Sequence, residues 1–375
     1  MIPTTSTLAI QQLASGDYLS LQVYKFLGSK AGKKAYLQAN LHGSEIVGNA
    51  VIHQLIEFLS SLDKAQLVGE IWLVPVCNPL GTNQRTHFFS TGRFNAYDGR
   101  DWNRIFWDYE KECEDLAAFA QSQVDLDQDE IRINYLNKIQ FEFQKELEKL
   151  NSPSSSPFRE RYRYYLQSLC LDANYVIDIH SSSNQSIDYL YCCCSREESA
   201  KAFLLDYGIL LNEYDGDAFD EAFIKPWLAL EKQLAKLGKE VQFDVESWTL
   251  ELGSGMIMNP ESVAKGIKGI KNYLVQKKML NIPDFPLAET ADHQTNFVLK
   301  SQIKTYYAPA GGMVQSRASL GSYIKSGQLL YQLLVFIKHG EMPKIIDVCA
   351  EEEGLVFNVS INHAVNQGEL VIELI

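Results

Sequence analysis

The segment Ala39-Asn-Leu-His-Gly-Ser-Glu45 holds the residues with the clearest potential for chemistry. His42 and Glu45 are three residues apart, where a strand pattern ends and a helical pattern begins. At this spacing an imidazole nitrogen and a carboxylate can reach the same point, and together they can fill two of the four positions of a tetrahedral zinc site. The same pattern also fits a surface histidine followed by a glutamate that complements a helix dipole.

A second histidine can supply a third ligand. The apolar run Tyr175-Val-Ile-Asp-Ile-His180 stops at a Ser-Ser-Ser turn. Because ligand sites in open α/β sheets lie at the carboxyl ends of the strands, His42 and His180 are expected to converge. Asp178 lies on the same strand face as His180 and can accept its second ring proton, although the two could also simply satisfy each other in a buried strand end. Two histidines and one glutamate leave a fourth position for water, which is typical of a catalytic site.

Glu251 is the candidate general base. It stands between two leucines in the strand pattern Trp248-Thr-Leu-Glu-Leu-Gly-Ser. A carboxylate in apolar surroundings is costly, and its pKa moves upward toward the range in which a base works near neutral pH. The alternative is a glutamate that faces solvent at the edge of the sheet.

Four arginines follow the third strand pattern and could provide positive charge: Arg85, Arg93, Arg100 and Arg104. One could stabilise an oxyanion, and another could bind a substrate carboxylate with its two-pronged guanidinium. A solvated basic loop is the competing interpretation.

Alternating β-rich and helical runs from about residue 21 to residue 280 predict βα units around a mainly parallel or mixed sheet. The helical spacing of apolar residues predicts a helix over 45–62, capped by Ser44. Residues 109–171 are predicted to form a charged helical insertion. The Ser- and Pro-rich segment 151–157 divides it in two, which indicates a helical hairpin with a flexible tip. The predicted strands are 21–27, 34–41, 70–76, 175–179, 187–194 and 248–252.

After about residue 283 the helical period gives way to a repeated glycine pattern. Gly312 and Gly327 lie 15 residues apart, and Gly354 and Gly368 lie 14 apart, which suggests a small barrel or sandwich built from two related halves. We therefore predict a hydrolase domain over 1–290 and a C-terminal β-barrel-like domain over 291–375, with a structural or oligomerising role. A homo-oligomer is an open alternative to a monomer.

The 375 residues carry 34 basic and 47 acidic side chains, and this net charge of −13 disfavours nucleic acid as a partner. No apolar run approaches the roughly 18 residues of a spanning helix, and the amino terminus lacks a signal-peptide pattern, so a membrane partner is not expected and the location is predicted to be cytoplasmic. The seven cysteines, three of them consecutive at 192–194, are interpreted as reduced thiols.

Five ordered motifs resemble the succinylglutamate desuccinylase/aspartoacylase family, which is related to the zinc carboxypeptidases. They are His42-x-x-Glu45, Asn78-Pro79, Asp101-Trp-Asn103-Arg104, Asp178-x-His180 and Glu251-Leu-Gly253. The family also carries a C-terminal β-barrel. Two features depart from its pattern: Trp102 replaces the usual leucine, and the insertion 109–171 is unusually large and could cover the pocket.

The resemblance implies one zinc ion per chain on His42, Glu45 and His180, with Glu251 as the base. It implies further that Asn103 and Arg104 bind a substrate carboxylate and that Arg93 stabilises the oxyanion, with Arg85 in reserve. A dicarboxylic substrate would need another arginine, for which Arg196 is the candidate between His180 and Glu251.

The sequence thus predicts a zinc-dependent hydrolase of carbon–nitrogen bonds other than peptide bonds, acting on a small N-acyl amino acid or related amide. Two alternatives remain open at this point. One is a metallocarboxypeptidase that acts on peptides, and the other is a non-catalytic protein of the same fold that binds an acylated metabolite.

Overall fold

A computed structural model of the chain describes residues 1–113, 115–150, 157–214, 216–288 and 293–375. Its largest part is a mixed sheet of nine strands in the order β1-β2-β4-β3-β5-β9-β7-β8-β10. The strands are β1 (Thr4–Gln12), β2 (Tyr18–Leu27), β3 (Lys30–Ala39), β4 (Val68–Val74), β5 (Tyr175–Ser182), β7 (Tyr189–Cys193), β8 (Tyr207–Leu211), β9 (Glu246–Ser254) and β10 (Asn296–Leu299).

The centre of this sheet is parallel, since β4, β3, β5 and β9 run in one direction. Strands β1 and β2 lie antiparallel at one side, and β7 is antiparallel to β9 at the other. Parallel strands at the centre of such a sheet are buried on both faces. The sequence of β5 is accordingly mostly apolar, and all its residues except Ser182 are buried. The prediction of a mainly parallel sheet flanked by helices is confirmed.

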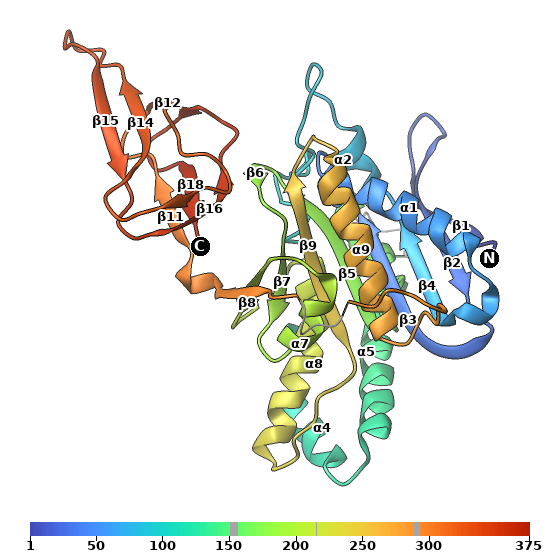
Figure 1. Ribbon diagram of the computed structural model, residues 1–375. Coiled ribbons are helices and arrows are strands. Elements are labelled where there is room, and N and C mark those ends of the chain that lie inside the picture. The colour runs from blue at the N-terminus through green and yellow to red at the C-terminus, as the bar shows by residue number, and fades with distance from the viewer. Residues whose placement is uncertain (114, 151–156, 215, 289–292) are drawn as a thin grey trace.

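Helices cover both faces of the sheet (Figure 1). On one face α1 (Val47–Ser61) and α9 (Pro260–Gln276) bury residues such as Val51, Leu55 and Ile270. The other face is covered by α8 (Phe219–Lys236) together with the insertion. The shorter helices are α2 (Pro79–Asn83) and α7 (Glu197–Ala200), with the 3-10 turns η1 (Lys64–Gln66), η2 (Lys201–Phe203) and η3 (Lys300–Gln302).

The insertion forms the helices α3 (Tyr109–Glu112), α4 (Leu116–Gln123), α5 (Gln128–Leu150) and α6 (Phe158–Ser168). The predicted flexible tip at 151–157 lies outside the described residues except for Pro157. Aromatic contacts join the insertion to its surroundings, with Tyr135 against Trp227 of α8 and Tyr162 of α6 against Trp102. Figure 1 shows α4 and α5 beside α8, at the end of the sheet away from α2.

The C-terminal segment folds into two small sheets, as the glycine repeat predicts. The first contains β11 (Lys304–Tyr307), β13 (Tyr323–Ile324), β16 (Gly354–Val359) and β18 (Leu370–Leu374), and the second contains β12 (Gly312–Gln315), β14 (Leu329–Val335), β15 (Lys344–Cys349) and β17 (Ala364–Val365). Gly327 and Gly368 both adopt a left-handed φ, of 79° and 85°, in the equivalent turns of the two halves.

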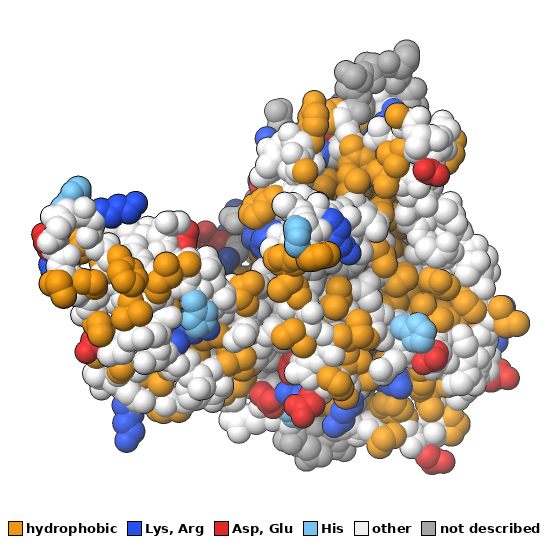
Figure 2. All heavy atoms as spheres, turned by 90° about the horizontal axis from the view of Figure 1, so that it is seen from above, with side chains coloured by type: hydrophobic (Ala, Val, Ile, Leu, Met, Phe, Trp, Pro, Cys, Tyr) orange, Lys and Arg blue, Asp and Glu red, His pale blue; other side chains and the backbone are white. Residues whose placement is uncertain are grey.

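The two halves exchange strands. Strand β13 of the first half pairs with β16 of the second half, and β17 of the second half pairs with β12 of the first. The short strand β6 (Gln185–Ser186), which follows β5, pairs with β16. Figure 2 looks down on the molecule from the top of Figure 1. It shows the C-terminal lobe beside the part that holds the nine-stranded sheet, with an indentation between the two. The domain division at residue 290 stays a prediction.

Several local predictions were wrong. Ser44 does not cap α1, which begins at Val47 without a side-chain cap. The backbone of Ser44 is instead bonded to Thr91 and Met256, so it ties the site loops together. Strands β1, β8 and β10 were not predicted; β1 is a polar edge strand without a clear apolar alternation. No helix in the described ranges combines the length and the apolarity that crossing a bilayer requires.

Candidate active site

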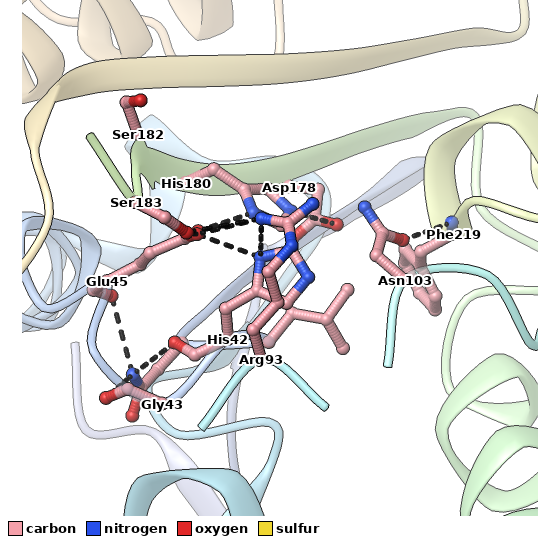
Figure 3. A network of polar contacts seen from close by, with 12 residues as sticks. His42, Gly43, Glu45, Arg93, Asn103, Asp178, His180, Ser182, Ser183 and Phe219 are labelled. Atoms are coloured by element: carbon pink, nitrogen blue, oxygen red, sulfur yellow. Dashed lines mark hydrogen bonds and ion pairs between the residues drawn. The ribbon is translucent and has the colours of Figure 1, made fainter. Parts of the chain in front are cut away.

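His42, Glu45 and His180 meet in a buried cluster at the carboxyl ends of β3 and β5 (Figure 3). Glu45 lies between the two histidines: its Oε1 is 2.8 Å from Nδ1 of His42, and its Oε2 is 2.8 Å from Nδ1 of His180. One ligand atom from each of the three residues lies within 4.8 Å of the other two. The convergence that the sequence predicts is therefore present in the structure.

A carboxylate holds the far nitrogen of each histidine. Asp178 Oδ2 is 2.9 Å from Nε2 of His180, as the sequence suggests, and Asp101 Oδ1 is 3.0 Å from Nε2 of His42. A carboxylate in this position fixes the ring orientation and the tautomer of a metal-binding histidine. The Nδ1 atoms then remain as ligand atoms beside Glu45, and this set of two imidazoles and one carboxylate suits a divalent metal ion such as zinc.

The electrostatics of the cluster favour charge on Glu45 and on His180. Burial raises the pKa of Glu45, but His42 and His180 outweigh it and hold that pKa well below its usual range. Burial lowers the pKa of His180, and here Asp178 and Glu45 outweigh it and raise the pKa well above the ordinary value. The acidic residues thus stabilise positive charge at this point of the pocket.

The conformation of the loop between β3 and α1 explains the residue types at positions 40 and 43. Asn40 adopts a left-handed φ of 69°, and its side-chain Nδ2 donates to the carbonyls of His42 (3.1 Å) and Gly43 (3.0 Å). A Cβ atom at Gly43 would overlap the carbonyl of Gly81, so a side chain at 43 is excluded. Asn78 donates to the carbonyl of Leu41 (2.8 Å) and caps α2, which explains the Asn-Pro motif.

Arg93 reaches the cluster because backbone hydrogen bonds attach its loop to the His42 loop. Gly43 N donates to the carbonyl of Gly92 at 3.2 Å. Arg93 Nε then lies 2.9 Å from Asp101 Oδ2, and its Nη1 lies 3.6 Å from Glu45 Oε1 and donates to Ser183 Oγ at 3.2 Å. Of the two arginines considered for the oxyanion, Arg93 is the one that the structure brings to the cluster.

Glu251 lies on β9, paired in register with His180 on β5. Its Oε2 atom is buried and has no hydrogen-bond partner among the described residues. Burial raises its pKa to about 7, although His180 and Arg93 act in the opposite direction. A carboxylate with a free oxygen and a pKa near neutrality can take up and release a proton at physiological pH.

His42, Arg93, His180 and Glu251 line one pocket with a volume of about 150 Å³, to which Asn103 and Arg104 also contribute. Asn103 Oδ1 accepts a hydrogen bond from the backbone of Phe219 at 2.8 Å. Figure 3 shows the other end of this amide turned toward the Arg93 side. Asn103 can therefore donate to an anionic group in the pocket.

Other predicted residues lie elsewhere. The guanidinium of Arg85 is exposed and donates to the carbonyls of Thr82 and Gln84. Arg196 is buried beside Glu231, 2.7 Å away, so it is not a second carboxylate-binding arginine of this pocket. The described part of the insertion contributes no residue to the pocket lining, and the expectation that it covers the pocket is not met.

Sequence reasoning missed several contributors. Asp101 was noted only as part of a motif, although it contacts both His42 and Arg93. Tyr191 of β7 and Asp220 of α8 also line the pocket. One feature of the sequence could have indicated Asp220. It follows the apolar Phe219 at the start of a helix, where an acidic side chain can be buried rather than exposed.

The sequence model of the succinylglutamate desuccinylase/aspartoacylase catalytic domain matches residues 31–276, which include every residue of the cluster. The chain belongs to this family. The family comprises deacylases that hydrolyse amide bonds, and its fold agrees with the nine-stranded sheet and the C-terminal β-segment found here.

Among curated proteins, N-alpha-acetyl-L-2,4-diaminobutyric acid deacetylase of Halomonas elongata is 24% identical over 234 residues, which are 58% of this chain. The match spans only 61% of that family member's length. A solved structure of a candidate family member from Shewanella frigidimarina NCIMB 400 has a TM-score of 0.88 at 26% identity and covers 100% of this chain and 97% of that one. Another, from Shewanella amazonensis SB2B, has a TM-score of 0.84 at 30% identity, with 99% and 98% covered.

Proposed function

We propose that this family member is a zinc-dependent hydrolase that cleaves the amide bond of a small N-acyl amino acid and releases an acid and an amine. The observation that carries the proposal is the free, buried Oε2 atom of Glu251 in the same pocket as the His42–Glu45–His180 cluster. A carboxylate without a partner beside a potential metal site is the arrangement that hydrolysis requires, because a protein that only binds a ligand has no use for a base.

His42, Glu45 and His180 would hold the metal ion, and Asp178 and Asp101 would keep the two imidazoles in the orientation for binding. When bound, a divalent ion supplies Lewis acidity that polarises the scissile carbonyl and makes water more acidic. The identity of the ion as zinc is inferred from the ligand types, two imidazoles and one carboxylate.

The chain's own groups supply the proton transfers. Glu251 takes a proton from the attacking water while the water oxygen forms a C–O bond to the carbonyl carbon. It then returns this proton to the amine nitrogen as the C–N bond breaks, so that the products are a free acid and a free amine. A base with a pKa near 7 serves both steps, because it is neither too weak to accept the proton nor too strong to release it.

Two arginines and an asparagine provide the remaining roles. Arg93 lies beside Glu45 and can neutralise the charge that develops on the carbonyl oxygen. Asn103 and Arg104 line the pocket and would bind the substrate carboxylate. A pocket of about 150 Å³ supports a small acylated amino acid rather than a peptide, because a peptide needs an extended cleft.

The test is hydrolysis of a panel of N-acetyl and N-succinyl amino acids beside a panel of short peptides, with purified, zinc-loaded protein. Glu251→Gln should lower kcat by at least about 100-fold while metal content stays unchanged. Glu261→Gln, an exposed residue of α9, is the matched control and should keep full activity. Unchanged turnover in the Glu251 variant, or a wild type that cleaves peptides but no acylated amino acid, would overturn the proposal.

A further inference from the structure

A second cavity lies where the C-terminal segment meets the nine-stranded sheet, and the proposed mechanism does not use it. Its volume is about 420 Å³, which is within the range of small-molecule sites. Its walls come from the starts of β7 and β8, the end of β9, the first two turns of α9 and the C-terminal segment. None of the described residues lines both this cavity and the pocket of Glu251.

Backbone pairing holds the C-terminal segment against the sheet at this cavity. Strand β6 pairs with β16 (Figure 1). Ile187 N donates to the carbonyl of Phe357 at 3.1 Å, and the hydroxyl of Ser186 donates to the same carbonyl at 2.9 Å. The rings of Tyr189 and Phe357 pack with their centres 5.7 Å apart. The cavity is therefore a fixed part of the fold.

The cavity lies on the opposite face of the sheet from the pocket of Glu251. Asp188 directly precedes β7 and pairs with Lys265 of α9, one of the two helices that cover this face. Leu190 of β7 packs into the core beneath the same helices, whereas the next residue, Tyr191, lines the pocket of Glu251. This alternation is what a strand requires. A ligand in the cavity is thus separated from the proposed reaction centre by the sheet.

One oxygen of Asp188 lacks a hydrogen-bond partner, although only 9% of the side chain is exposed. Oδ2 lies 3.0 Å from Lys265 Nζ, but the buried Oδ1 has no partner among the described residues. A buried acceptor without a donor is costly. Gly253 also lines the cavity, and a Cβ atom there would lie 3.6 Å from Oδ1 and 2.8 Å from Ser262 Oγ. The missing side chain of Gly253 thus leaves space beside the unpaired oxygen.

The charged side chains of the cavity leave negative charge in excess. Among the described residues that line it, Lys265 is the one cation, and it lies 3.0 Å from Asp188 and 3.8 Å from Asp206. One lysine thus serves two carboxylates. His293 lies 3.8 Å from Asp206 but does not line the cavity. The cavity therefore favours a cationic group beside Asp188 over an anionic one.

Apolar side chains form much of the remaining wall: Ile187, Tyr207, Ile257, Leu320 and Leu355. A wall of this kind gains energy from contact with an apolar group. The cavity is also far larger than one water molecule, whose share of liquid volume is about 30 Å³. It therefore suits a ligand that combines a cationic head with an apolar body.

We propose that this cavity binds a small primary ammonium compound with an aliphatic body. The ammonium group donates to Oδ1 of Asp188, and the aliphatic part packs on Ile257 and Leu320. A primary ammonium group fits this position because it carries three N–H donors and a full positive charge. The proposal goes beyond the proposed function and does not depend on it, since binding in this cavity requires no hydrolysis.

The experiment compares two probes that differ only in the head group: isoamylamine, which is protonated at neutral pH, and isoamyl alcohol. Titration calorimetry on the full chain should show at least about 10-fold tighter binding of the amine. Asp188→Asn should weaken amine binding about 10- to 100-fold and leave alcohol binding within about threefold. Glu261→Gln is the matched control, because Glu261 is an exposed acid of the same helix, α9, that does not line the cavity.

Ile257→Lys is a second variant that the fold should tolerate, because Ile257 is 56% exposed. Its added charge should weaken amine binding as Asp188→Asn does, whereas Ile257→Leu should bind the amine like the wild type. A wild type that prefers neither probe, or amine binding that Asp188→Asn leaves unchanged, would overturn the proposal. Loss of amine binding in Asp220→Asn but not in Asp188→Asn would also overturn it, because the ammonium group would then lie in the pocket of Glu251.

Discussion

Asp101 Oδ1 lies 3.0 Å from Nε2 of His42, and its other oxygen lies 2.9 Å from Nε of Arg93. One carboxylate therefore orients both a candidate metal ligand and the candidate oxyanion group. Burial raises the pKa of Asp101, but His42 and Arg93 outweigh it and hold that pKa well below its usual range. Asp101 is thus charged at neutral pH and acts on the site through two other residues.

Asp101→Asn should weaken metal binding by about 10- to 100-fold and lower kcat/KM at saturating metal, because both His42 and Arg93 lose their charged partner. The metal dissociation constant can be measured by competition with a chelating dye. Asp98→Asn is the control, since Asp98 belongs to the same loop but pairs with Arg159. Equal metal affinity in the Asp101 variant and the wild type would contradict this role.

His180→Ala should abolish stoichiometric metal binding. The reason is that two of the three ligand groups, His42 and Glu45, would remain in a site designed for three. Elemental analysis should find about one zinc ion per wild-type chain and much less than that in the variant. His53→Ala, which changes an exposed histidine of α1, should bind zinc like the wild type, and full occupancy in His180→Ala would show that the cluster is not the metal site.

The sequence could predict the centre of this site because the physics that places it is local. Parallel strands end at one edge of a sheet, so His42 and His180 had to converge, and the period of two along β5 put Asp178 beside His180. The role of Asp101 could not be predicted in the same way. It depends on a long loop whose path is set by backbone hydrogen bonds such as Gly43 to Gly92, which carry no side-chain pattern.

The insertion shows a similar limit. Its periodicity predicts helices correctly, but periodicity does not say which surface of the molecule a helix will cover. In the structure α6 packs behind the loop of Asp101 rather than over the pocket. Its contact partner in that loop is Trp102, so the insertion packs against the one residue of the Asp101–Arg104 motif that departs from the family pattern.

Trp102→Leu should therefore destabilise the protein although it restores the residue usual in the family. The indole of Trp102 is buried, and its ring lies 5.3 Å from that of Tyr162 and 6.1 Å from that of Phe158. Loss of these contacts and the resulting cavity should cost about 1–3 kcal/mol of unfolding free energy. Urea denaturation can measure it, with Phe141→Leu as an exposed aromatic control; equal midpoints for the Trp102 variant and the wild type would refute the packing role.

Asp220 should make the metal-free protein less stable as pH rises. Burial raises its pKa to about 6 from an ordinary 3.8, so the folded state favours the protonated form. The stability contributed by this group is full below about pH 4 and is lost as pH rises through 6. Asp220→Asn stays neutral, so its free energy of unfolding relative to the wild type should increase by about 2 kcal/mol between pH 4.5 and pH 8. Urea titrations of apoprotein at both pH values can test this, with Asp217→Asn as the control, because the side chain of Asp217 is 46% exposed and pairs with Lys111. A difference between variant and wild type that is the same at both pH values would show that the pKa of Asp220 is not raised in the folded protein.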